Sequence, residues 1–159
     1  MGTTGLKGPF IQFVKYGISG AIATGVHLTV FYVMAIWILP ALTGDDPMIR
    51  LLGFGAPASV SDGVRATRAA VDTGVAFMIS NFTAYLMNIL WVFKRGRHHW
   101  AVEISMFYLV SGISLLVGTL MQTWLILHWG VSTTLAFGTN MIASLAINFV
   151  VRKFVIFKS

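Results

Sequence analysis

The longest stretch without a charged side chain decides most of what this chain can fold into. No Asp, Glu, Lys or Arg occurs in residues 104–151, a run of 48 residues. As a single helix this run would be about 72 Å long, more than twice the roughly 30 Å hydrocarbon core of a bilayer. It must therefore fold back on itself, and the polar, glycine-containing residues 128–134 provide the turn. We predict helices over residues 103–127 and 134–152.

Two shorter charge-free runs predict two more helices. Residues 16–39 form a run of 24 that Pro40 ends, and residues 73–93 form a run of 21. Each run is long enough to cross a bilayer. Hydrophobic residues make up 57% of the chain and charged residues only 10%, too few to cover a water-soluble globule. The sequence therefore predicts an all-α integral membrane protein with a single domain, residues 1–159, and four transmembrane helices at about 16–39, 73–93, 103–127 and 134–152.

The outer connection, residues 41–70, is long for a link between two antiparallel helices. Its middle is apolar around Arg50, and Pro57 and the residues after it indicate a break before residue 63. We expect a short helix at the membrane interface here. An irregular loop is an equally favoured alternative.

Lysine and arginine are distributed unevenly between the two sides of this arrangement. Eight lie near the chain ends and in the connection between the second and third helices: Lys7, Lys15, Lys94, Arg95, Arg97, Arg152, Lys153 and Lys158. The other side has three bases and four acids: Arg50, Arg65, Arg68, Asp45, Asp46, Asp62 and Asp72. Because cytoplasmic segments carry the excess of bases, both termini are predicted to be cytoplasmic.

The second half of the chain weakly repeats the first. Ser19 and Gly20 near the start of the first helix recur 92 positions later as Ser111 and Gly112. The second and fourth helices correspond at an offset of 64, as in the pairs Gly74/Gly138 and Ser80/Ser144. Two helical hairpins, each with an even number of crossings, point the same way, so the pattern predicts a parallel repeat.

Each half also ends in a recognisable motif. Residues 84–94 (AYLMNILWVFK) and 148–158 (NFVVRKFVIFK) resemble the Asn-Phe-x-x-Asn-Arg-x-Trp-x-Phe signature of the GtrA-like family. Residues 13–24 are similar to that family's first helix, and the resemblance extends from Phe10 to the end of the chain. It implies a four-helix protein of the bacterial inner membrane that flips polyprenyl-phosphate-linked sugars for cell-surface polysaccharide synthesis, beside a membrane glycosyltransferase.

The chain departs from the family pattern at three positions. Many members have an acidic residue on the first helix where this chain has His27, and Arg152 and Val155 replace the expected Asn and Trp of the second motif. These departures leave the sugar and any coupling to protons open.

Polar side chains inside the predicted spans are candidates for substrate binding, because they are costly in hydrocarbon and normally face the bundle interior. On the second helix Asn81, Tyr85 and Asn88 share one face, and on the fourth a polar stripe runs through Asn140, Ser144, Asn148 and Arg152. For Gln122 and Asn140 we favour simple bonding between helices. A neutral, hydrogen-bonded His27 is favoured over a proton-linked one.

Basic residues at the cytoplasmic helix ends are candidates for holding a lipid phosphate. If the two hairpins pack together, five of them meet at one membrane level: Lys15, Lys94, Arg95, Arg152 and Lys153. The alternative is that they only set topology and attract anionic lipids. The sequence favours a binding role most for Arg152 and Lys153, which continue the polar helical face.

The sequence indicates no enzyme, cofactor or metal site, and no nucleic-acid partner. It has no cysteine, no phosphate-binding glycine loop and no catalytic triad motif. The leading hypothesis is therefore a transporter of a polyprenyl-phosphate sugar, and the alternative is a scaffold that recruits or stabilises a glycosyltransferase. A small cation exporter is disfavoured, because no carboxylate lies well inside a predicted span.

A homodimer is also predicted, with the second or fourth helix at the interface. If the polar stripes of these helices faced lipid, each exposed amide or guanidinium would cost a few kcal/mol. A second copy closing over them would remove that cost.

Overall fold

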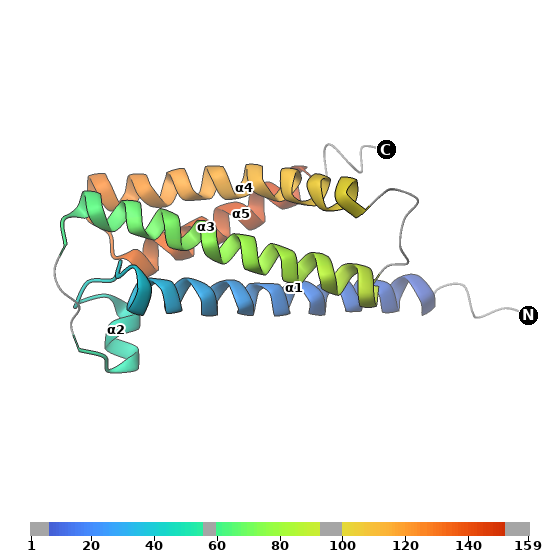
Figure 1. Cartoon of the computed structure of the whole chain (residues 1–159), viewed down its shortest axis with the longest axis horizontal. Helices are drawn as coiled ribbons and strands as arrows, with labels where there is room; N and C mark the ends of the chain where they lie inside the picture. Colours follow the sequence, from blue (N-terminus) through green and yellow to red (C-terminus); the bar gives the residue numbers. More distant parts are fainter. Residues whose placement is uncertain (1–6, 56–59, 93–99, 152–159) are drawn as a thin grey trace, which may run out of the picture.

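The computed structural model is a bundle of long helices lying side by side (Figure 1). It describes residues 7–55, 60–92 and 100–151, and these residues contain no strand. The long helices are α1 (Lys7–Val33), α3 (Asp62–Met87), α4 (Trp100–Trp129) and α5 (Thr133–Val151). The first two continue as π-helical segments, η1 (Met34–Ile38) and η2 (Asn88–Val92), and the short α2 covers Pro47–Leu52. The predicted all-α class is confirmed.

The long helices pack as two antiparallel pairs. α1 lies against α3, α4 lies against α5, and contacts between α3 and α4 join the pairs (Figure 1). Two helical hairpins were expected from the internal repeat. We call the end of the bundle that carries α2 and the turn between α4 and α5 the loop end, and the opposite end, where α1 begins, the terminal end.

Three segments are long and apolar enough to cross a membrane: Val14–Ile38, Asp62–Trp91 and Ser111–Trp129. Much of their outward surface is aliphatic, as lipid contact requires, and Leu109, Leu116 and Leu120 on α4 are each more than half exposed. The chain is a membrane protein. α5 is not among the three segments, so a fourth crossing stays a prediction.

The predicted helix boundaries differ most from the structure at α3. This helix begins at Asp62 rather than at residue 73, and the connection predicted over residues 41–70 is correspondingly shorter. The prediction stopped at charged residues, on the argument that charges lie outside the membrane. The structure accommodates Arg65 and Arg68 within the helix, because both guanidinium groups donate to backbone carbonyls at the loop end.

The other long helices also exceed their predicted bounds at one end or both. α1 begins at Lys7 rather than at residue 16, and α4 covers Trp100–Trp129 rather than 103–127. The fourth helix was predicted over 134–152 and is observed over Thr133–Val151, while residue 152 lies outside the described part. The turn after α4 is at the predicted place, and Gly130 adopts the left-handed φ of 59° that glycine tolerates.

The short helix expected in the outer connection is present as α2. Asp46 caps it by accepting a hydrogen bond from the amide of Met48 (3.0 Å), and Pro47 occupies its first turn. Gly53 ends it with a φ of 67°. Residues 47–52 of the connection therefore form a helix that is closed at both ends by standard helix-end chemistry.

A hydrogen-bond network holds the loop end together. Buried Asp46 also accepts from the amide of Thr134 (3.0 Å) and from its hydroxyl, so one carboxylate caps both α2 and α5. Arg65 is 2% exposed, pairs with Asp62 at 2.9 Å and donates to the carbonyl of Val131 at 2.7 Å. These contacts tie the connection after α1, the start of α3 and the start of α5 into one unit.

Candidate functional site: a polar cavity between the four long helices

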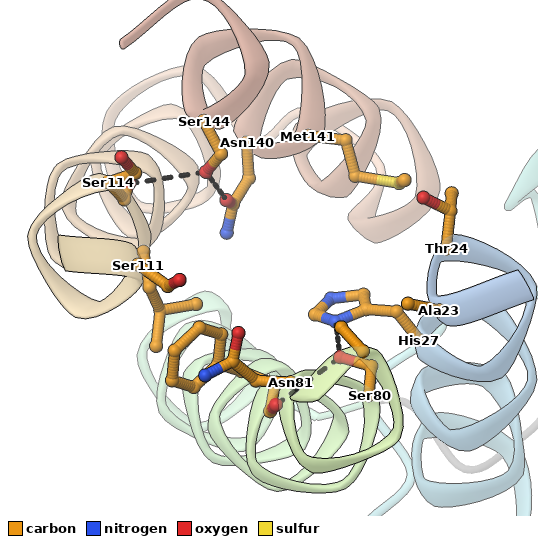
Figure 2. A pocket seen from close by; sticks show the side chains of 13 residues that line it. Ala23, Thr24, His27, Ser80, Asn81, Ser111, Ser114, Asn140, Met141 and Ser144 are labelled. Carbon is orange, nitrogen blue, oxygen red and sulfur yellow. Dashed lines mark hydrogen bonds between the residues drawn. The ribbon is translucent and has the colours of Figure 1, made fainter. Parts of the chain in front are cut away.

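A partly open cavity of about 210 Å³ lies inside the bundle, and all four long helices contribute to its wall (Figure 2). More than half of the side chains that line it are polar, although the bundle is apolar as a whole. The polar lining residues are Thr24 and His27 from α1, Ser80 and Asn81 from α3, Ser111 and Ser114 from α4, and Asn140 and Ser144 from α5.

His27 is held against the α3 side of the cavity (Figure 2). Its Nδ1 lies 3.0 Å from Ser80 Oγ, and Ser80 Oγ donates to the carbonyl of Phe77 at 3.2 Å. Since the serine has a single proton to donate, His27 Nδ1 carries the hydrogen of the contact between the two side chains. The imidazole also stacks on Phe137, with ring centroids 5.5 Å apart. His27 is therefore bonded from α1 to α3, and whether it is linked to proton movement stays a prediction.

The opposite wall is a chain of hydrogen bonds between α4 and α5. Ser144 Oγ lies 3.2 Å from both the Ser114 carbonyl oxygen and Asn140 Oδ1, so its single proton is shared between these two acceptors. Asn140 Nδ2 donates to Gln122 Oε1 at 2.7 Å. Gln122 and Asn140 therefore bond helix to helix, as predicted. The close approach depends on Gly118, where an added Cβ would lie 2.2 Å from Asn140 Oδ1.

Asn81 differs from these bonded side chains. It is 7% exposed and lines the cavity, yet its amide nitrogen Nδ2 has no hydrogen-bond partner. A buried donor without a partner is costly and needs an explanation. This nitrogen is itself enclosed, so a ligand in the cavity would give it an acceptor after a turn of the Asn81 side chain. The described lining contains no carboxylate, lysine or arginine, so its polar groups are hydroxyls, amides and the His27 imidazole, set among apolar side chains.

Comparison with known families agrees with this architecture. The family described as "GtrA/DPMS, transmembrane domain" matches residues 15–157, nearly the whole chain. The chain belongs to the GtrA/DPMS transmembrane-domain family. No curated protein and no solved structure matches it. Membership in the GtrA/DPMS family indicates a part in membrane processes that involve glycans or polyprenyl-linked sugars.

The described part of the family motif at the end of the first half begins at Ala84 in the cavity wall and continues toward the terminal end. Asn81 is in the cavity wall, while Tyr85 and Asn88 follow on the same buried face of α3, at 7% and 9% exposure. Asn88 begins the π-helical η2, and its side-chain oxygen Oδ1 is buried without a partner. The three predicted residues thus form one inward-facing line from the cavity to the terminal end.

Lys15 is the one predicted phosphate ligand whose side chain the structure describes. Its Nζ lies 3.5 Å from the carbonyl of Trp91 and 5.5 Å from the centroid of the Trp91 ring. The start of the α1 span and the end of α3 therefore meet at the terminal end. Four other predicted ligands, Lys94, Arg95, Arg152 and Lys153, and the side chain of Asn148 lie outside the described part of the chain.

Of the four cavity serines, sequence reasoning selected only Ser144, as part of the polar stripe on the fourth helix. Ser80, Ser111 and Ser114 also line the cavity, but single serines are common in membrane helices and carry little signal alone. The internal repeat contained the available clue, because it pairs Ser80 with Ser144 and Ser19 with Ser111. Three of these four residues line the cavity, and the fourth, Ser19, is buried with an unpartnered hydroxyl.

Two sequence arguments need correction. The homodimer was inferred because the stripes on the second and fourth helices would otherwise face lipid, but Asn81 and Asn140 face the interior of a single chain. That argument for a dimer is therefore wrong, and dimerisation itself stays untested. The cation exporter was disfavoured because no carboxylate lies well inside a predicted span, and the structure shows that Asp72, one residue before the second of these spans, is buried within the longer apolar segment Asp62–Trp91.

Proposed function

We propose that the protein is a multi-pass protein of the bacterial inner membrane that translocates a polyprenyl-phosphate-linked sugar, with four crossings and both termini in the cytoplasm. The observation that carries this proposal is the polar cavity formed by all four long helices of an apolar bundle. A sugar headgroup cannot enter hydrocarbon with its hydroxyls unpaired. The cavity would supply hydroxyl and amide partners for the sugar hydroxyls midway across the membrane.

The lining suits a neutral, hydroxyl-rich ligand. Ser111, Thr24 and Asn81 present small hydrogen-bonding groups that can accept and donate, and Asn81 has an unused donor. At about 210 Å³ the cavity is below the roughly 300–1,000 Å³ of sites for drug-sized molecules. A headgroup would therefore pass with its polyprenyl chain remaining outside in the lipid.

The terminal end would receive the phosphate. Lys15 lies there beside Trp91, and Asn88 with its unpartnered oxygen lies between this lysine and the cavity along α3. A lysine ammonium attracts a phosphodiester as a point charge, and the unplaced bases Lys94, Arg95, Arg152 and Lys153 would add to the same cluster. The line of inward-facing side chains from Asn88 to Asn81 would then lead the sugar from the terminal end into the cavity.

We infer that the protein performs no covalent chemistry on the sugar. Glycoside hydrolysis typically uses a pair of carboxylates, and the described cavity wall contains none. A partner glycosyltransferase would use the sugar after it has crossed.

Leaflet exchange by the purified protein tests the proposal. Liposomes containing a labelled polyprenyl-phosphate sugar would be reconstituted with wild-type protein, and exchange would be followed by the accessibility of the label from outside. Asn81→Leu should lower the exchange rate at least about tenfold, the equivalent of about 1.4 kcal/mol of lost hydrogen bonding in the crossing state. Thr67→Val is the matched control, because its exposed hydroxyl bonds only to Gly63 of the same helix.

The alternative function, a scaffold for a glycosyltransferase, predicts a different result. The dense network at the loop end favours it, because a passage through that end would have to break several partly buried hydrogen bonds. Exchange that appears only when a transferase is co-reconstituted, with equal rates for wild type and Asn81→Leu, would replace the transporter with the scaffold.

A further inference from the structure

Asp72 is a buried carboxylate that the proposed headgroup pathway does not use. It lies on α3 with 0% exposure, and neither carboxylate oxygen has a hydrogen-bond partner in the described part of the chain. Its neighbours one turn away on the same face, Ala69 and Ala76, are also 0% exposed. Ten residues separate Asp72 from the helix start at Asp62, about 15 Å along the axis.

An ionised carboxylate is expensive in such surroundings. Burial of a charge costs several kcal/mol unless a counter-charge or several donors satisfy it, and Asp72 has neither within hydrogen-bonding distance. A metal ion is a poor solution, because hard cations take six or more oxygen ligands, and the described residues contain no group of three or more His, Cys, Asp or Glu. A single proton neutralises the group without further ligands.

Charged and titratable groups on the elements around Asp72 have bonded partners of their own, although Arg68 is near enough to act on the Asp72 charge. Arg68, one turn toward the loop end, donates to the carbonyl of Pro40 at 2.9 Å, and Arg65 is paired with Asp62. The described residues of η1, η2 and α5 include no titratable side chain. On α1 and α4 the described titratable side chains all have interactions of their own: Lys15, Tyr16, His27, Tyr32, Tyr108 and His128.

A chain of close polar contacts leads from the residue after Asp72 to the cavity. Thr73 Oγ1 donates to the Ala69 carbonyl at 2.7 Å and lies 3.1 Å from Gln122 Oε1, which accepts from Asn140 in the cavity wall. Gln122 Nε2 is buried without a partner, so this connection has an unused donor at its centre. A shift of α3 at Asp72 would therefore alter the wall that contacts a headgroup.

We propose that Asp72 is a proton-binding site whose loading is linked to occupancy of the cavity, so that headgroup movement is coupled to a proton. This linkage rests on the proposed function. On release, the O–H bond of the carboxyl breaks, its electron pair stays on the oxygen, and water at the loop end accepts the proton. The new carboxylate attracts Arg68, four residues earlier on the same face, and draws its guanidinium from the Pro40 carbonyl. The loop end is loosened as a result.

Infrared difference spectroscopy of the purified full chain tests the proton site without any lipid substrate. With aspartate labelled by ¹³C, the wild type should show the C=O stretch of a protonated carboxyl that disappears at high pH, and Asp72→Asn should lack this band. Asp45→Asn, which changes an exposed carboxylate in the same region, should retain it. A wild type without the band, or a band that survives in Asp72→Asn, overturns the proposal.

The linkage is tested by the pH dependence of leaflet exchange. The wild-type rate should change about fivefold or more across the pH range in which the infrared band is lost, and Asp72→Asn should be flat over that range. Equal pH dependence in both proteins overturns the linkage. If the wild type exchanges no lipid at any pH, the proposed function fails. In that case the infrared band decides the linkage, because its loss on adding the labelled lipid would show that the proton site responds to the lipid.

Discussion

The loop end and the central cavity are both polar regions of an apolar bundle, but they differ in how their polar atoms are satisfied. At the loop end Asp46 caps two helices, and Arg65 has an acid and a carbonyl as partners. In and beside the cavity, Asn81 Nδ2 and Gln122 Nε2 are buried without partners. Both charged groups are engaged at the loop end, although Ser132 Oγ in the turn after α4 is buried without a partner. Engaged charges indicate structure, whereas the unused amide donors at the cavity indicate a place where a ligand completes the hydrogen bonding.

The largest effect on stability should come from breaking the loop end. Asp46→Ala removes the caps of α2 and α5, each worth about 0.5–2 kcal/mol, and should lower the free energy of unfolding by about 3 kcal/mol in total. Asp45→Ala, at the preceding exposed position, should leave the unfolding midpoint unchanged. Thermal unfolding in detergent measures both variants. Similar midpoints for the two would contradict the structural role of the loop end.

The second-largest effect on stability should come from disturbing the contact between α4 and α5. A methyl group at Gly118 would lie 2.2 Å from Asn140 Oδ1 and 2.8 Å from Ser144 Oγ, so Gly118→Ala should destabilise the protein by about 2 kcal/mol through overpacking. Gly112→Ala, on the same helix with no atom within 4 Å of the added carbon, should be neutral or stabilising. The pair can be compared by unfolding in the same detergent. If Gly118→Ala is as stable as Gly112→Ala, the wall between α4 and α5 is not as close as described.

The smallest effect on stability should come from the cavity. Asn81→Ala removes a buried donor that has no partner, so the cost should stay within about 1 kcal/mol, well below that of Asp46→Ala. Its leaflet exchange should nevertheless fall as for Asn81→Leu. If Asn81→Ala unfolds as readily as Asp46→Ala, Asn81 supports the fold rather than ligand binding.

Much of the fold was predictable from charge spacing, and the errors of that prediction have one cause. The 48-residue run without charge predicted the α4–α5 hairpin and its turn, because no single helix of that length fits a bilayer. The same reasoning placed the start of α3 at residue 73, because it could not foresee that Arg65 and Arg68 would find carbonyl partners from distant residues. Tertiary hydrogen bonds of this kind leave no periodic signal.

The site was predictable only helix by helix. The spacing of Asn81, Tyr85 and Asn88 predicted one inward face, and the structure places all three inward. Asn81, Ser111 and Thr24 surround one cavity because of how their three helices are shifted along their axes relative to one another. The spacing of residues within one helix does not determine this shift. Gly118 was missed for the same reason, since its importance comes from the partner it meets on α5.

The most direct test of the central claim is protection of the cavity by its ligand. The chain has no native cysteine, so Ser111→Cys introduces a single thiol into the cavity wall, and Ser61→Cys introduces one at an exposed position of the loop end. Both would be labelled with a small water-soluble maleimide in liposomes, with and without a polyprenyl-phosphate sugar. The account predicts that the lipid slows labelling of Ser111→Cys and leaves Ser61→Cys unchanged. Equal labelling of Ser111→Cys with and without saturating lipid would contradict it.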